Sequence, residues 1–290
     1  MFRRIYRQRR RILVAGFFTL LGVIFFLSED LDVLLSASEG ATWLIYLSFV
    51  LTAVVAALFA MALAALWITL FPNWRFLVEQ SALIFILFSA FDALAPGRTE
   101  GFGALAPLAI FFVICSATYG NLLDRFPGWL RHGAVRRFRS DRSPDALWRG
   151  LVEEDGTMTI PIDEVQPVDG ASDLERVKRS LGAGTFRLST RRIIADEAPF
   201  RHAYRFEGDT SAANKPITSG SFEVRIDARP DGGADVMVTE IHDALLWRDG
   251  INMWLDDAVG SLVDHMSAMD RGKSDWSVEG IVRRRIIALA

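Results

Sequence analysis

The chain contains one cysteine, three lysines and very few charged residues in its first half. The single cysteine, Cys115, lies in an apolar run, so no intramolecular disulfide can form and a secreted disulfide scaffold is excluded. The formal net charge of -3 argues against a nucleic-acid partner. Only nine charged residues lie between Ile12 and Leu123, whereas fifty lie in 131–290. This division, with 51% hydrophobic residues, excludes a single soluble domain and a disordered chain.

Long apolar runs predict a membrane region over 1–126. A helix needs about 20 apolar residues to cross the hydrocarbon core. Four segments are predicted as spans, at 12–27, 41–71, 76–95 and 104–123. The first is short for a span, and the third carries Glu79 and Asp92 near its ends. Asp92 either reaches the outer headgroups or has a functional role inside the membrane.

The placement of arginine predicts the orientation of these spans. Six arginines precede the first span, and six more lie in 125–142 after the fourth. Cytoplasmic segments near spans are rich in arginine and lysine, and an even number of spans returns the chain to its starting side. We therefore expect an integral protein of the inner (cytoplasmic) membrane with both termini cytoplasmic and the lipid bilayer as a partner. The alternative is a cleaved signal peptide over 1–38, although the apolar stretch ends about ten residues before its Ser36-Ala37-Ser38 site.

Beyond Phe126 the charge density rises and strand-like alternation begins. A short strand is predicted over 133–140. The sequence Ser143-Pro144-Asp145 then predicts the start of a helix, because serine caps helices and proline is tolerated at the first helical position. A loop is predicted over 157–173. Antiparallel strands follow at 184–195, 200–207, 221–227 and 235–242, with a turn at 229–233. One long helix is predicted over 247–269, where apolar residues recur every three or four positions.

The order of these elements resembles the SRPBCC or START-like superfamily, in which a curved antiparallel sheet wraps around a long C-terminal helix. The matching pieces are SPDALW at 143–148, SGSFEV at 219–224 and GGADVMVTE at 232–240, followed by the long helix. The resemblance covers 131–271. It implies an α+β helix-grip fold around an apolar cavity for lipids, polyketides or other hydrophobic molecules. The chain departs from the pattern in its arginine-rich first strand, its long loop at 153–175 and its attached spans.

Motifs of the common enzyme classes are absent from the sequence. There is no Walker A loop, no dinucleotide-binding glycine fingerprint directly after a strand, no His-Glu-x-x-His and no Gly-x-Ser-x-Gly. The histidines do not have the spacing or register of a metal site; they are His132, His202, His242 and His265. No catalytic residue, metal or cofactor is therefore assigned.

The inward faces of the predicted strands hold the candidates for a ligand site. Strand parity places Glu240 and His242 on the same side as Val238, and His202 also faces inward. An imidazole and a carboxylate in an apolar cavity could act as an acid–base pair, could orient a polar group of a ligand, or could lie at the sheet rim. The same positions are also compatible with an ordinary packed core that has no cavity. The candidate ligand-site residues are Trp148, Phe186, Phe200, His202, Tyr204, Phe206, Phe222, Val224, Val238, Glu240, His242 and Trp254.

Three functions are compatible with this sequence. The leading hypothesis is a membrane-anchored cytosolic domain that binds a hydrophobic or lipid-like ligand. The second is an enzyme of the polyketide cyclase/dehydratase kind, and the third is an assembly module for a membrane-protein partner. The basic, apolar tail 272–290 could lie on an anionic leaflet or pack on the domain or a partner. A pocket with converging polar groups would favour the enzyme, and an apolar tunnel would favour ligand carriage.

Overall fold

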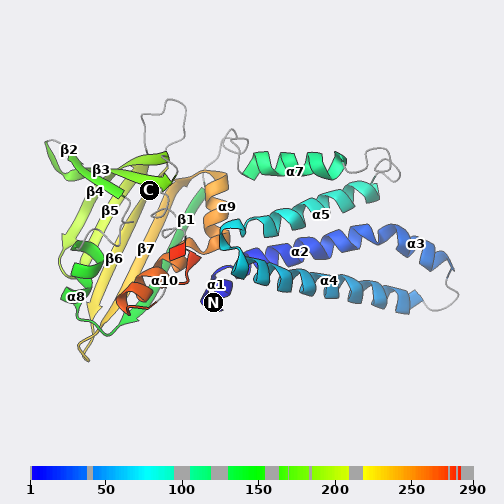
Figure 1. Cartoon of the computed structure of the whole chain (residues 1–290), viewed down its shortest axis with the longest axis horizontal. Coiled ribbons are helices and arrows are strands. Elements are labelled where there is room, and N and C mark those ends of the chain that lie inside the picture. Colours follow the sequence, from blue (N-terminus) through cyan, green and yellow to red (C-terminus); the bar gives the residue numbers. More distant parts are fainter. Residues whose placement is uncertain are drawn as a thin grey trace. The chain divides into compact units, whose positions relative to one another are not determined.

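The structure is a computed structural model that describes residues 2–37, 42–94, 105–118, 130–153, 163–168, 170–182, 185–208, 218–273, 275–278 and 280–281. The chain divides into two compact units, Met1–Arg125 and Phe126–Ala290. The first unit is helical, and the second combines a sheet with helices (Figure 1).

Among its described residues, the first unit contains the helices α1 (Phe2–Arg7), α2 (Arg9–Phe26), α3 (Ser28–Ala37), α4 (Thr42–Leu70), η1 (Pro72–Trp74), α5 (Leu77–Leu94) and α7 (Leu105–Thr118). Two segments of the described chain are long and apolar enough to cross a membrane, Thr42–Leu70 and Pro72–Leu94. They correspond to the predicted spans 41–71 and 76–95. The predicted span 12–27 lies in α2, which begins with three arginines, and the predicted span 104–123 extends beyond the described part of α7.

Helix α2 packs closely against both α4 and α5. Gly16 faces Met61 of α4, and Gly22 faces Phe85 of α5, so closely that a Cβ at either glycine would lie 2.5 Å from the neighbouring side chain. Arg11 of α2 is only 1% exposed and forms an ion pair with Glu79 of α5. A buried charge is costly unless it is paired, so this ion pair fixes α2 against α5.

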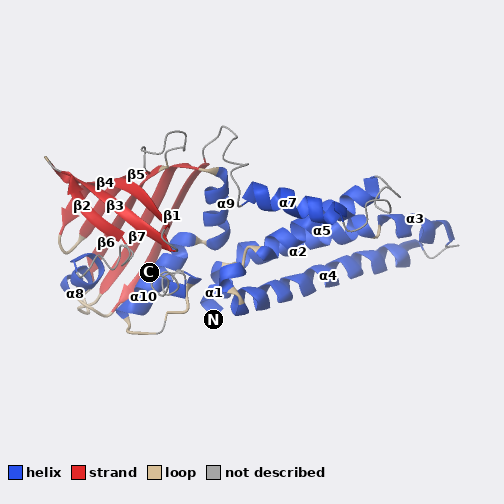
Figure 2. Ribbon diagram, turned by 45° about the horizontal axis from the view of Figure 1, so that its top comes forward, coloured by secondary structure: helices blue, strands red, loops and turns tan. Residues whose placement is uncertain are grey.

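The second unit contains a seven-stranded antiparallel sheet in the order β1-β7-β6-β5-β4-β3-β2 (Figure 2). Its strands are β1 (Leu130–Ser140), β2 (Asp163–Val168), β3 (Ala171–Gly182), β4 (Thr185–Glu197), β5 (Arg201–Gly208), β6 (Ser219–Ala228) and β7 (Ala234–Leu245). The predicted strands correspond to β1 and β4–β7. The predicted turn at 229–233 joins β6 to β7, and Gly232 there has a φ of +86°, which suits glycine.

The prediction of a loop at 157–173, and of a longer loop at 153–175, is wrong in part. Strand β2 and the start of strand β3 lie within these ranges. Strand β3 has charged residues on both faces, so its sequence lacks the alternation that marks a half-buried strand. It pairs antiparallel with β2 and β4, and ion pairs also link its side chains to β4. Arg191 of β4 pairs with Glu175, and Arg192 pairs with Asp173 at 3.4 Å.

The predicted single helix over 247–269 is two helices, α9 (Trp247–Asp256) and α10 (Ala258–Asp270). Asp257 separates them with a left-handed φ of +45°, and its buried carboxylate lies 2.5 Å from a guanidinium nitrogen of Arg136 on β1. Apolar periodicity continues across this break, which is why the sequence did not reveal it. Leu255 is buried, whereas Trp254, a candidate for the inward face, is 45% exposed, so its predicted inward position is wrong.

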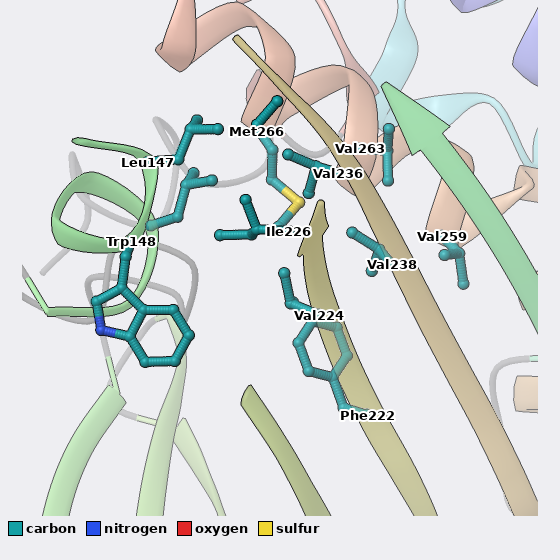
Figure 3. Packing of buried hydrophobic residues seen from close by; sticks show 12 residues of the cluster. Leu147, Trp148, Phe222, Val224, Ile226, Val236, Val238, Val259, Val263 and Met266 are labelled. Carbon is teal, nitrogen blue, oxygen red and sulfur yellow. The ribbon is translucent and has the colours of Figure 1, made fainter. Parts of the chain in front are cut away.

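The core of the second unit lies between the sheet, α10 and the short helix α8 (Pro144–Trp148), which precedes η3 (Arg149–Glu153). Ser143 caps α8 as predicted, since its Oγ accepts a hydrogen bond from the Ala146 amide at 3.4 Å. The buried cluster contains Leu147, Trp148, Leu151, Phe222, Val224, Ile226, Ala234, Val236, Val238, Val259, Val263 and Met266 (Figure 3). A sheet that packs on a C-terminal helix in this way is a helix-grip arrangement.

Candidate ligand-binding cavity

A cavity of about 390 Å³ lies between the inner face of the sheet and α9. Strands β3 to β7 contribute most of its wall, and α9 closes it. The lining residues are Val177, Ser189, Arg191, Tyr204, Phe206, Gly208, Thr218, Phe222, Glu240, His242, Leu245, Asp249, Asn252, Met253, Asp256 and Ala258.

The cavity begins on β7 where the apolar core ends. Side chains two positions apart share one face of a strand, so Val236, Val238, Glu240 and His242 all point inward. The two valines are completely buried in the core, whereas Glu240 and His242 line the cavity. The inward parity predicted for Glu240 and His242 therefore places them in a cavity wall.

Helix α9 leaves this end of the unit unfilled because its inner face is mostly polar. Asp249, Asn252 and Asp256 line the cavity together with Met253. Their spacing of three, four and seven positions places them on one side of a helix. In contrast, α10 fills the other end of the unit with Val259, Val263 and Met266, which belong to the core cluster.

Glu240 and His242 form a hydrogen-bonded pair in this wall. Nε2 of His242 lies 2.7 Å from Oε1 of Glu240, and the ring packs edge-on against Phe206 with 5.2 Å between centroids. Nδ1 of His242 is buried and has no hydrogen-bond partner among the described residues. Because a carboxylate oxygen can only accept, we assign a hydrogen to Nε2 of His242, which donates to Glu240. Glu240 is then a fixed carboxylate acceptor at the cavity surface.

A cation, Arg191 of β4, also lines the cavity. The guanidinium of Arg191 lies 5.4 Å from the centroid of the Tyr204 ring and forms an ion pair with Glu175. Because Arg191 and Arg192 are adjacent in β4, charge alone does not indicate which of them points inward. Arg191 can face the cavity because Glu175 and the face of Tyr204 stabilise its charge. The sequence did not identify Arg191 as a site residue, because the partners that stabilise its charge lie on other strands.

Five of the twelve predicted site residues line the cavity, namely Tyr204, Phe206, Phe222, Glu240 and His242. Trp148, Val224 and Val238 lie in the solid core instead, although Phe222 belongs to both the core and the cavity wall. The structure therefore separates the predicted inward face into a packed region and an open one.

His202, Phe200 and Trp254 are not among the described residues that line the cavity. His202 packs edge-on against Trp148 and Tyr204, and its Nδ1 lies 3.1 Å from Oδ1 of Asp196. Phe200 is 51% exposed. Trp254, which was predicted to face inward, is on the outer side of α9. The side chain of Phe186 lies outside the described part of the structure. Within the described residues, no three side chains of His, Cys, Asp or Glu form a group that could hold a metal ion.

No protein-family model and no curated protein sequence matches the chain. Among solved structures, protein Mll3558 from Rhizobium loti is 13% identical, covers 50% of this chain and 99% of its own, and has a TM-score of 0.38. Ara h 8.0201 is 15% identical, with 50% and 100% coverage and a TM-score of 0.36. A protein from Rhizobium leguminosarum is 13% identical, with 50% and 98% coverage and a TM-score of 0.39.

Proposed function

We propose that this protein is a membrane-anchored helix-grip protein whose second unit binds a hydrophobic or lipid-like ligand with a hydrogen-bond-donating head group. The Glu240–His242 pair in the wall of the cavity is the observation that carries this proposal. The volume of about 390 Å³ lies in the range of small-molecule sites, which combine apolar walls with a few fixed polar groups.

The two ends of the proposed ligand contact different parts of the cavity. Tyr204, Phe206 and Phe222 provide aromatic surface for an apolar body. The Glu240 carboxylate accepts a hydrogen bond from His242 and retains a second oxygen that can accept one from a ligand. A hydroxyl or an amine can donate to this oxygen. A ligand carboxylate would be repelled by Glu240 on β7 and by Asp249 and Asp256 on α9, whereas the charge of Arg191, the one cation among the described lining residues, is already paired with Glu175.

Native mass spectrometry of the full chain released from detergent micelles tests this head-group preference. The probes are dodecylamine, dodecanol and dodecanoate, which share one apolar chain. We expect adducts with the amine and the alcohol, and much weaker binding of dodecanoate. A hydrogen bond to a charged group contributes about 1.5–3 kcal/mol, so Glu240→Gln should weaken amine binding by roughly 10- to 100-fold.

Glu207→Gln is the matched control, because Glu207 is an exposed glutamate at the end of strand β5 in the same sheet. It should bind the amine like the wild type. Equal binding of all three probes, unchanged by Glu240→Gln, would exclude the proposed role of Glu240. If none of the probes binds, the assembly-module hypothesis replaces ligand binding as the leading one.

The anchor that we propose has four spans with both termini in the cytoplasm. The arginine clusters on either side of the apolar region and the two long apolar helices support it. The packing of α2 against α4 and α5, with the Arg11–Glu79 ion pair, favours a retained helix over a cleaved signal peptide. An alkaline phosphatase fused after Ala37 should be active, and one fused after Ala290 should be inactive. The reverse pattern, or an intact mass that lacks 1–38, would overturn this topology.

The second candidate function is catalysis of the cyclase or dehydratase kind. The 2.7 Å contact of His242 with Glu240 favours it, because a carboxylate and an imidazole in a cavity can transfer protons to and from a bound molecule. The same mass spectra distinguish it from simple binding. A dehydratase would lower the mass of a hydroxylated ligand by one water during incubation, and His242→Ala would abolish that change while the ligand still binds.

A further inference from the structure

The outer face of α9 is apolar and exposed, while the inner face that lines the cavity is mostly polar. Trp247, Ile251 and Trp254 are 41%, 45% and 45% exposed, respectively. Their spacing of four and three residues aligns them in one stripe along the helix. A surface helix of a soluble domain normally has the opposite arrangement, with its apolar stripe toward the core. An exposed stripe with two tryptophans indicates an interaction surface.

We infer that this outer face of α9, formed by Trp247, Ile251 and Trp254, inserts into the headgroup region of a phospholipid bilayer. The inference rests on the membrane anchor proposed above. Tryptophan is enriched at the membrane–water interface, because its ring is largely apolar and carries one N–H donor. A helix with an apolar face and a polar face can lie in the plane of that interface.

The chain itself limits the distance between α9 and the membrane. The side chain of Leu130, the first residue of β1, packs so closely on Gly250 of α9 that a Cβ there would lie 2.7 Å from it. Leu130 follows Thr118, the last described residue of α7, by about a dozen residues. Such a segment reaches at most about 40 Å when fully extended. If α7 belongs to the fourth span, the bilayer lies within that reach of α9.

The charges of α9 are also compatible with contact to a bilayer. Asp249 and Asp256 would be repelled by anionic lipids, but both line the cavity on the inner side of the helix. The exposed stripe contains no acidic residue. An apolar face free of negative charge therefore remains for the lipid, while the acidic groups face the ligand cavity.

A fluorescent probe in α9 tests this inference in the full-length protein. The native cysteine is replaced by Cys115→Ser, and Ile251→Cys is labelled with an NBD fluorophore. Asp227→Cys, at an exposed position of β6, carries the same label as a control. Both proteins are reconstituted into phosphatidylcholine–phosphatidylglycerol vesicles with and without lipids that carry a nitroxide near the headgroup.

We expect the nitroxide to quench the probe at 251 at least about twofold more strongly than the probe at 227, with a blue-shifted emission at 251. Equal quenching in protein that floats with the vesicles would overturn the inference and leave the anchor intact. A blue shift without lipid quenching would also overturn it, because the face would then be covered by protein, such as a second copy. Protein that does not float with the vesicles would remove both the anchor and this inference.

Discussion

Nδ1 of His265 on α10 lies 2.6 Å from Oδ2 of Asp275, and this contact holds the segment after α10 against the helix. The other carboxylate oxygen of Asp275 accepts a hydrogen bond from the amide of Ser277 at 2.8 Å. Burial by itself raises the pKa of Asp275, but the hydrogen bonds from His265 and Ser277 lower it more, so the pKa lies below its usual value.

This lowered pKa predicts a loss of stability in acid. A carboxyl group with a depressed pKa in the folded state stabilises the protein above its unfolded pKa of about 3.9, and this contribution is lost as the pH falls through the folded pKa. Asp275→Asn should reduce the unfolding free energy at pH 7 by about 1.5–3 kcal/mol, and its difference from the wild type should shrink below about pH 4. Thermal unfolding of the full chain by near-UV circular dichroism measures both effects. Asp227→Asn, at an exposed position, should show neither, and a constant difference for Asp275→Asn across this range would contradict the prediction.

The cavity predicts that Val177 and Val224, which are both buried, respond differently to replacement by phenylalanine. Val177 lines the cavity and Val224 is completely buried in the core. Val224→Phe should destabilise the protein by about 1–3 kcal/mol, because a close-packed core cannot accept the extra volume. Val177→Phe should leave the melting temperature nearly unchanged and should reduce dodecylamine binding. Equal destabilisation by the two changes would mean that the cavity cannot accept a side chain.

Helix α10 offers a matched pair of methionines for testing its orientation. Met266 is 1% exposed in the core, and Met269 is 41% exposed on the same helix. Met266→Ala should lower the unfolding free energy by about 2–5 kcal/mol through lost burial and a residual cavity, whereas Met269→Ala should change it by less than about 0.5 kcal/mol. Denaturant titration of the full chain compares them. Similar losses for both variants would show that α10 is rotated from the orientation described here.

The break between α9 and α10 depends on a buried ion pair. The side chain of Asp257 is 3% exposed, and Arg136→Leu would remove the guanidinium that lies 2.5 Å from it. Breaking a buried pair costs about 3–5 kcal/mol, and the partial exposure of Arg136 places this pair at the lower end of that range. Arg131→Leu on the same strand is the control, because the Arg131–Asp243 pair is mostly exposed and should contribute less than about 1 kcal/mol. Comparable melting temperatures for the two variants would show that Asp257 does not depend on Arg136.

Elements with strong local signals were predictable from the sequence. The β6–β7 hairpin has alternating apolar residues and a turn that contains Gly232, and the α8 helix begins at a serine cap. The same alternation placed Glu240 and His242 on the inner face together. The cavity residues Tyr204, Phe206 and Phe222 follow from strand parity for the same reason.

The missed features depend on contacts between segments that are distant in sequence. Arg191 faces inward because of Glu175 on another strand, and Asp257 adopts its left-handed backbone beside Arg136. Apolar spacing in 247–269 indicated a helix but could not show which face points inward. The break between α9 and α10 lets α9 take its own orientation. In that orientation Trp254 points outward and Leu255 is buried.

The pairing of β1 with β7 has a consequence for the synthesis of the protein. In the described sheet, β1 is an edge strand that pairs only with β7, and paired residues such as Arg131 and Asp243 are 112 residues apart. At about 5–20 residues per second, a ribosome needs roughly 6–20 s to add that many residues. During this time β1 has been made but has no partner strand. Its arginines, with Arg131 and Arg139 mostly exposed even in the finished sheet, are of the kind that prevents an unpaired strand from aggregating.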